Sequence, residues 1–254
     1  MSGATALTDT EIGAIVRGGL ADPFALLGMH PLGGPGGGPV EIRTFCPAAS
    51  AAFVTPAGAD RMPMTRVHPD GLFVWSSGKP ATPFAYVLSF ETLDGQCWST
   101  EDPYCFLPQL GDLDLHLFNE GRHWRAYDVF GARPWRAGPV EGVLFSVWAP
   151  NASTVSVTGN FNGWDRRRHP MRSRGPSGVW ELFVPRVLPG ELYKFSVTGR
   201  DGITREKADP FGARFELRPA TASVVTPASG FEWTDGAWME RRAGASRFRS
   251  AMSV

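Results

Sequence analysis

One stretch decides the fold class: Val155-Ser-Val-Thr-Gly-Asn-Phe-Asn-Gly-Trp164. It begins as an alternating strand in which Val155, Val157 and Phe161 point to one face. The polar residues that we expect on the opposite, outward face are Ser156, Thr158 and Asn160. The strand breaks at Asn162-Gly163, a dipeptide that tolerates the positive φ of a tight turn. The stretch therefore predicts a strand followed by a turn in a β-structure.

Trp164 follows this turn at once and is followed by the polar and basic run Asp165–His169. An aromatic plate beside hydrogen-bonding groups suits a sugar ring, whose faces carry C–H and whose rim carries hydroxyls. The alternative is that Trp164 folds back over a sheet edge as packing, because tryptophan is well buried on average. Trp180, by contrast, alternates with Leu182 and Val184 on an expected inward face.

The composition excludes several classes of function. The chain has 254 residues, 43% hydrophobic and 20% charged, which suits one or two packed domains. The formal net charge of zero argues against a nucleic acid or an anionic membrane as partner. The short run Arg166–Arg168 is typical of a solvated turn. No apolar stretch is long enough to span a bilayer, and the N-terminus lacks the pattern of a signal peptide.

The cysteines indicate a reducing compartment. Cys46, Cys97 and Cys105 are an odd number without a C-x-x-C pair. This pattern disfavours a disulfide framework or a zinc site. We therefore expect a cytoplasmic protein with reduced thiols, with no metal and no other cofactor.

Turn residues divide the chain into short elements. Thr8–Glu11 has capping-box spacing before apolar residues at helical intervals, which predicts a helix ending near Gly18-Gly19. Gly33–Pro39 predicts a flexible surface loop, because it lacks the Lys-Ser/Thr ending of a phosphate loop. Helical character returns at Asp112–Arg125. The expected strands are Val40–Phe45, Ala51–Thr55, Leu72–Ser76, Phe84–Thr92, Val143–Trp148, Val155–Phe161, Val179–Val184 and Leu192–Thr198.

The two sets of strands repeat each other. Gly28 and Gly131 are 103 residues apart, as are Pro47 and Pro150. Further along the chain the spacing of equivalent residues is 107. The pairs at this second spacing are Pro63 and Pro170, Gly71 and Gly178, Tyr86 and Tyr193, Asp94 and Asp201, and Asp102 and Asp209. So many matched Gly, Pro and Asp residues predict a tandem duplication.

The duplication predicts an all-β chain of two tandem immunoglobulin-like β-sandwich modules, with short N-terminal and inter-module helices. We expect the N-terminal helix in residues 1–21, the first module in residues 22–115 and a linker in residues 116–138. The second module is expected in residues 139–230. Residues 231–254 form a tail without a clear hydrophobic period.

The change in spacing places four extra residues between Pro150 and Pro170, around Trp164. Residues shared by both copies are expected to be scaffold, and residues found only in the second copy are candidates for a site. Lys194 is a second candidate, because its counterpart is Val87 and it lies on the strand face opposite the apolar residues. There it can donate hydrogen bonds to hydroxyls. An ordinary surface lysine is the alternative.

Six segments of the second copy together resemble a known family: Ser146–Ala152, Gly159–Trp164, His169–Met171, Ser177–Leu182, Leu192–Phe195 and Lys207–Pro210. They resemble carbohydrate-binding module family 48, and more narrowly the second N-terminal module of bacterial glycogen (1,4-α-glucan) branching enzymes. The ending Arg218–Ser223 strengthens the narrower match. The first copy, with Asp22–His30 at its head, resembles the extra N-terminal module of those enzymes. The resemblance covers the chain up to about Met239.

The resemblance implies a binding site for α-glucan, such as glycogen or a maltooligosaccharide. Trp164 and Lys194 match the tryptophan and lysine that contribute to glucan binding in the family, and Asn160 and Asn162 lie in the same motif. Stand-alone glycogen-sensing modules of the family have a second tryptophan after the lysine strand. Here the corresponding loop, Gly199–Thr204, has no aromatic residue. We therefore expect one aromatic plate and weak affinity.

The resemblance also implies that catalysis lies elsewhere. Branching enzymes carry a carboxylate nucleophile and a carboxylate acid/base on a (β/α)₈ barrel, which needs about 250 residues. Two sandwiches use most of this chain, and Ser250–Val254 resembles the first strand of the absent barrel. The carboxylates with no recognisable catalytic pairing are Glu181, Glu191, Glu206 and Glu216. We expect no catalytic residue in this chain, which would be a monomeric, non-catalytic front of the enzyme.

Three functions compete at this point. The first is the glucan-binding module pair of a branching enzyme. The second is a scaffold whose sandwiches dock onto a partner barrel and bind no sugar. The third, a complete small enzyme, lacks a nucleophile constellation. The front end of another glycogen-active enzyme, such as a debranching enzyme, is a variant of the first function; the duplicated front favours branching.

Overall fold

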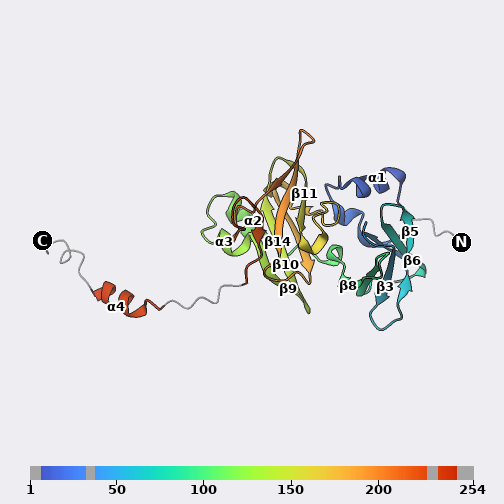
Figure 1. Ribbon diagram of the computed structural model, residues 1–254, viewed down its shortest axis with the longest axis horizontal. Helices are drawn as coiled ribbons and strands as arrows, with labels where there is room; N and C mark the ends of the chain where they lie inside the picture. The colour runs from blue at the N-terminus through green and yellow to red at the C-terminus, as the bar shows by residue number, and fades with distance from the viewer. Residues whose placement is uncertain (1–6, 33–37, 228–233, 245–254) are drawn as a thin grey trace.

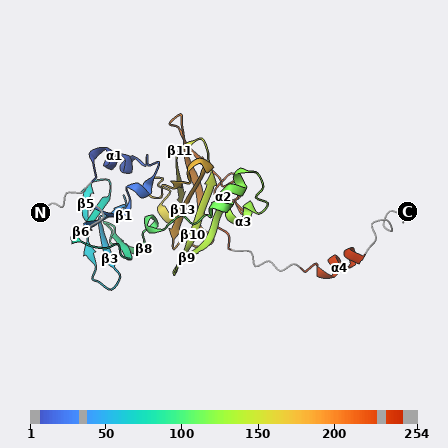
Figure 2. The same cartoon turned by 180° about the vertical axis from the view of Figure 1, so that it is seen from behind.

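The computed structural model describes residues 7–32, 38–227 and 234–244. Two β-sandwiches lie side by side, and the chain passes from one to the other once (Figures 1 and 2). The strands pair antiparallel throughout. The predicted all-β class with immunoglobulin-like modules is confirmed.

The first module packs two four-stranded sheets, with strand orders β1-β2-β6-β5 and β4-β3-β7-β8. The strands are β1 (Gly28–Pro31), β2 (Pro39–Phe45), β3 (Ala51–Pro56), β4 (Met62–Pro63), β5 (Thr65–His68), β6 (Leu72–Pro80), β7 (Tyr86–Glu91) and β8 (Cys97–Glu101). Strand β7 alternates buried and half-buried residues, as a strand with one inward face should. Val54, Phe73 and Leu88 meet in the core between the sheets.

The second module repeats this arrangement, with strand orders β12-β13-β10-β9 and β11-β14-β15, and with β16 on β14. The strands are β9 (Gly131–Ala137), β10 (Val140–Trp148), β11 (Ala152–Gly159), β12 (Arg172–Ser173), β13 (Val179–Pro185), β14 (Leu192–Gly199), β15 (Thr204–Lys207) and β16 (Ser223–Val224). Its core includes Phe145, Phe195 and Trp180. Trp180 is 4% exposed, so its predicted inward position is confirmed.

Helices occupy the predicted places at the N-terminus and between the modules. Thr8 caps α1 (Asp9–Arg17) in a complete capping box with Glu11, and Gly18 ends the helix with a φ of 66°. The inter-module helices are α2 (Asp112–Asn119) and α3 (Ala126–Val129). The short 3₁₀ turns are η1 (Pro23–Ala25), η2 (Pro103–Cys105), η3 (Asn160–Asn162) and η4 (Gly175–Ser177).

The tail contains α4 (Gly236–Gly244), although the sequence shows no apolar period there. The helix buries no residue. It is rich in good helix formers such as Ala237, Met239 and Glu240, so local propensity explains it better than packing. Most of the predicted surface loop Gly33–Pro39 and the end of the tail lie outside the described residues.

The internal repeat extends to individual hydrogen bonds. Tyr86 donates its hydroxyl hydrogen to Asp102 at 2.7 Å, and Tyr193 donates to Asp209 at 2.5 Å. All four side chains lie between 1% and 6% exposed. Burial raises the pKa of Asp102 to about 6 and also raises the pKa of Asp209. Both modules therefore close the same corner with the same buried pair.

A glycine holds a second matched corner in each module. Gly71 and Gly178 have φ values of 97° and 71°, where other residues are strained. A Cβ at Gly71 would lie 2.4 Å from the carbonyl oxygen of Cys46, and at Gly178 2.7 Å from Pro150. The carbonyl oxygens of both glycines accept a backbone hydrogen bond at 2.8 Å. The shared glycines are scaffold, as predicted.

Arginines of the second module make many of the contacts between the modules. The guanidinium of Arg172 lies 3.2 Å from the ring centre of Phe24, and burial lowers its pKa to about 10. Arg186 makes two hydrogen bonds of 2.8 Å to the carboxylate of Glu101. Tyr104 of the first module donates towards the backbone carbonyls of Arg168 and Pro170. These contacts fix one module against the other.

Candidate functional site

The predicted site lies on the turn that follows β11. Gly159 ends the strand and η3 follows it. Gly163 and Trp164 then have φ values of 65° and 60°. The left-handed region is uncommon for a bulky side chain, so neighbouring contacts must hold Trp164 there. One of them is a hydrogen bond of 3.0 Å from the backbone N–H of Trp164 to the carbonyl of Gly159.

Asn162 supplies most of these contacts from inside the turn. Its Oδ1 accepts from the backbone N–H of Gly159 at 2.9 Å. Its Nδ2 donates to the carbonyl of Val157 and approaches Nδ1 of His169, each at 2.9 Å. The side chain is 1% exposed and its polar atoms are engaged. The structure therefore corrects the prediction of Asn162 as a sugar contact: it holds the turn.

Trp164 presents its ring at the surface. The residue is 41% exposed, which favours the exposed plate over the packing alternative. Its indole N–H donates to Oδ1 of Asn160 at 3.1 Å. Asn160 is exposed and keeps its amide N–H groups unused by this contact. Asn160 thus orients the plate and can also donate beside it.

The polar face of β11 differs from expectation. Ser156 and Thr158, predicted to face outward, are 4% and 1% exposed. Thr158 donates towards the carbonyl of Lys194 at 3.4 Å and the carboxylate of Glu206 at 3.2 Å. The predicted outward exposure was wrong for these two residues, because other groups cover their face, Glu206 of β15 among them.

Lys194 lies beside the turn that carries Trp164. It pairs with Thr158 across β11 and β14, and its neighbour Tyr193 pairs with Gly159. Lys194 is half-buried and makes no ion pair with any residue described by the structure. A lysine with unused donors therefore stands at the end of the strand pair from which the turn of Trp164 begins.

The arginines after Trp164 contact the first module, which corrects the prediction of a solvated turn. Arg166 donates to the carbonyl of Gly18 at 3.4 Å. Arg167 bonds Asp165 at 2.8 Å and lies 5.6 Å from the ring centre of Phe45. The loop that presents Trp164 is thus anchored against the end of α1 and the end of β2.

His169 is a functional candidate that sequence reasoning did not identify. Burial, followed by the charge of Arg168, lowers its pKa to about 3, so the ring is neutral near pH 7. Asn162 donates to Nδ1, which leaves the hydrogen of the neutral ring on Nε2. The sequence showed His169 only as part of a His-Pro-Met motif, and nothing in that motif revealed its burial.

Comparison with known families decides what these modules are. Residues 8–104 match the family described as alpha-1,4-glucan branching enzyme GlgB, N-terminal domain. Residues 129–212 match carbohydrate-binding module 48, also described as isoamylase N-terminal domain. The chain belongs to the N-terminal region of the GlgB branching-enzyme family.

Curated members of the GlgB family agree over most of this chain. The 1,4-alpha-glucan branching enzyme GlgB of Cellvibrio japonicus is 45% identical over 92% of the chain and 32% of its own length. The enzyme of the same name from Methylococcus capsulatus is 47% identical over 87% of the chain and 29% of its own length. The chain therefore spans about a third of the GlgB relatives that it matches.

Two of the carboxylates in this GlgB region accept hydrogen bonds from the backbone and so stabilise the fold. Glu181 is 1% exposed and accepts the backbone N–H groups of Gln109 and Leu110, each at 3.0 Å. Glu216 accepts the backbone N–H of Ala222 at 2.9 Å. Within the described ranges no cluster of three metal-binding side chains occurs, and no helix is long and apolar enough to cross a membrane.

Proposed function

We propose that this chain binds α-glucan, such as glycogen or a maltooligosaccharide, through its second module. In the longer proteins of the family it would position glucan chains for the formation of α-1,6 branches during glycogen biosynthesis. The observation that carries the proposal is the exposed ring of Trp164, held at a φ of 60° on a loop that is longer than its counterpart in the first module.

The geometry around Trp164 supports contact with a sugar ring. The bond from the indole to Asn160 fixes the plate before a ligand arrives, which reduces the entropy lost on binding. Lys194 and the free amide of Asn160 can donate to hydroxyls at the rim of the sugar. Stacking on one plate contributes roughly 1–3 kcal/mol, by analogy with bases stacked on aromatic side chains. We therefore expect weak binding of a single segment.

Docking onto the rest of a longer chain is the second candidate. It is favoured by large aromatic residues that the described part of the chain leaves exposed, Trp124 at 91%, Trp148 at 51% and Trp135 at 41%. The catalytic carboxylates would then come from the partner barrel, so this chain alone should not branch amylose. An unchanged iodine stain of amylose after incubation with the pure protein is the expected result, and a shift absent from an inactivated control would contradict it.

Retardation in a native gel cast with glycogen separates the two candidates. The wild-type chain should migrate more slowly in glycogen than in an empty gel. Trp164→Ala should lose about ten- to a hundred-fold in affinity and migrate freely. Trp124→Ala removes a more exposed tryptophan outside the site and should be retarded like wild type. Equal retardation of Trp164→Ala and wild type would contradict the proposed site.

We further propose a cytoplasmic, monomeric protein. Cys46, Cys97 and Cys105 are unpaired, which suits a reducing compartment. Size-exclusion chromatography should show one chain of 27.6 kDa per particle.

A further inference from the structure

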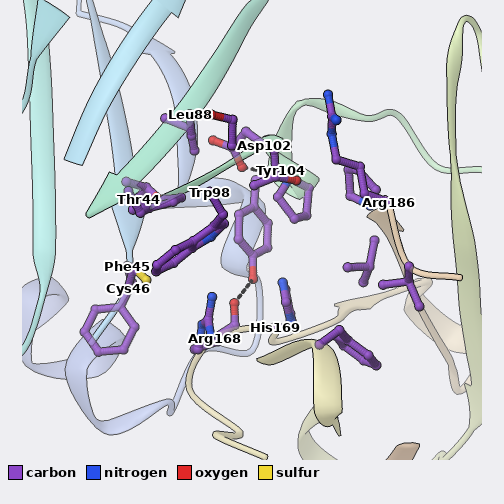
Figure 3. A pocket seen from close by; sticks show the side chains of 18 residues that line it. Thr44, Phe45, Cys46, Leu88, Trp98, Asp102, Tyr104, Arg168, His169 and Arg186 are labelled. Carbon is purple, nitrogen blue, oxygen red and sulfur yellow. Dashed lines mark hydrogen bonds between the residues drawn. The ribbon is translucent and has the colours of Figure 1, made fainter. Parts of the chain in front are cut away.

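A cavity of about 190 Å³ lies between the two modules. The end of β2 and strands β7 and β8 form its walls on one side, and the loop after η3 and the end of β13 form them on the other. Figure 3 shows Trp98 of the first module and Arg168 and His169 of the second on the walls, with Tyr104 between them. Its size corresponds to roughly six water molecules at 30 Å³ each, which is room for one sugar ring and not for a run of rings.

Trp98 gives the cavity an aromatic wall. Its ring stacks on Phe90 with the centres 5.3 Å apart and the planes 27° apart. Phe90 covers one face of the indole, and Trp98 itself lines the cavity. Within the described ranges the indole N–H of Trp98 makes no hydrogen bond. The cavity therefore contains a flat apolar surface with a donor at its edge.

Arg168 also lines the cavity, and its charge acts on Cys46 and His169 in the wall. Its two neighbours in the run are engaged, Arg166 with Gly18 and Arg167 with Asp165. The backbone carbonyl of Arg168 accepts from Tyr104, but no described residue accepts from its guanidinium. A half-buried guanidinium without an acceptor is costly unless water or a ligand supplies one.

His169 adds a neutral donor whose tautomer is fixed. Asn162 cannot turn its amide around, because Oδ1 accepts from Gly159 and Nδ2 donates to Val157. Its Nδ2 therefore donates to Nδ1 of His169, and the ring that lines the cavity keeps its hydrogen on Nε2. This tautomer can donate to an oxygen and adds no charge.

The charges and donors select the class of ligand. An anion would meet the carboxylate of Asp102 in the wall, and the second guanidinium at the rim, Arg186, is already neutralised by Glu101. An apolar ligand would leave three donors unsatisfied. A neutral ring with apolar faces and hydroxyls at its rim satisfies both the indole face and the donors.

We propose that the cavity between the modules binds the terminal glucosyl unit of an α-glucan, stacked on Trp98 and hydrogen-bonded by Arg168 and His169. This inference rests on the proposed glucan binding of the chain. The loop after η3 then carries two contacts: Trp164 at the surface, for a segment of the chain, and Arg168 in the cavity, for a chain end.

Fluorine NMR of protein labelled with 5-fluorotryptophan tests the cavity, because the nine tryptophans give separate reporters that substitution can assign. Maltotetraose is titrated into wild type and into Trp164→Ala, which removes the surface plate. The Trp98 signal should shift in both proteins. In Arg168→Met the affinity reported by Trp98 should fall about tenfold, as expected for loss of a charged donor. Arg205→Met, on an exposed guanidinium outside the cavity, should match wild type.

The outcomes separate this inference from the proposed function. A shift of Trp164 with a silent Trp98 would overturn the cavity site and leave the surface site standing. If neither the Trp98 signal nor the Trp164 signal shifts, both the cavity site and the surface site are overturned. A Trp98 signal that responds to inorganic phosphate but not to maltotetraose would overturn the sugar site in favour of an anion. Should Arg168→Met fail to fold, the titrations of wild type and Trp164→Ala still decide the question.

Discussion

The first and second modules share one framework and differ in one turn. Between Pro56 and Met62 the first copy has a five-residue turn, residues 57–61, whereas residues 160–168 of the second copy form a nine-residue loop. The short turn closes on its own sheet, where Arg61 lies 3.5 Å from the ring centre of Phe53 and bonds Glu91 at 2.6 Å. The long loop exposes Trp164 and reaches the neighbouring module.

This difference shows how an exposed loop, the proposed binding surface, can be added to a fold without changing its corners. The buried Tyr–Asp bond and the left-handed glycine recur in both copies, so the insertion leaves the framework intact. The strand beside the loop changes in parallel, with Lys194 where the first copy has Val87. Shared residues therefore report on stability, and the unshared Trp164 and Lys194 are the proposed binding residues.

The largest expected effect is a loss of stability at the matched core positions. Trp180 and its counterpart Phe73 are 4% and 1% exposed. Trp180→Ala and Phe73→Ala should each lower the free energy of unfolding by about 3–5 kcal/mol, because each leaves a cavity in a packed core. Urea unfolding measures both. A loss below about 1 kcal/mol at either position would break the equivalence of the two cores.

The second effect depends on pH and concerns His169, whose place in the first module is taken by Met62. The pKa of His169 is lowered in the folded state to about 3. The contribution of this neutral ring to the free energy of unfolding is therefore complete above the unfolded pKa of about 6.5. It is lost as the pH falls from that value towards the folded pKa. His169→Gln should remove this dependence. The stability advantage of wild type over the variant should shrink by about 2 kcal/mol between about pH 7 and pH 5. A constant difference would show that His169 titrates normally.

The third effect compares the two buried Tyr–Asp bonds. Tyr86→Phe and Tyr193→Phe each remove a hydroxyl that donates to a buried carboxylate. Each should cost about 1–2 kcal/mol of unfolding free energy, since the carboxylate loses a partner. Thermal or urea unfolding of both variants sharpens the comparison. A large loss of unfolding free energy in one module with none in the other would mean that the shared bond stabilises only one of the two modules.

The smallest effect concerns the ion pair between the modules. Glu101→Gln weakens the two hydrogen bonds from Arg186, whose side chain is 57% exposed. Exposed pairs contribute less than about 1 kcal/mol, so the unfolding free energy should change by no more than that. A larger loss would show that the modules unfold as one unit that depends on this contact.

The sequence predicted the framework well because repeated turn residues mark corners that local geometry requires. The equivalence of Tyr86 with Tyr193, and of Gly71 with Gly178, follows from their constant spacing along the chain. Trp180 followed from alternation. For Trp164 the sequence left an exposed ring and a packed ring as alternatives.

Contacts between distant segments could not be predicted in this way. Alternation placed Thr158 outward, but Glu206 from another strand helps to cover it. The run Arg166–Arg168 looked solvated because only the folded chain brings α1 against it. Asn162 was predicted as a ligand contact because the sequence alone does not distinguish a buried asparagine from an exposed one.

Amide NMR of the chain titrated with maltoheptaose tests most directly whether the second module carries the surface site. The two turns are internal controls for each other, since they occupy equivalent places on the same framework. The largest shifts should fall on Gly159–Trp164 and on β14 around Lys194, while residues 57–61 of the first module stay unchanged. Shifts of equal size in both turns, or shifts confined to residues 57–61, would contradict the assignment of glucan binding to the inserted loop.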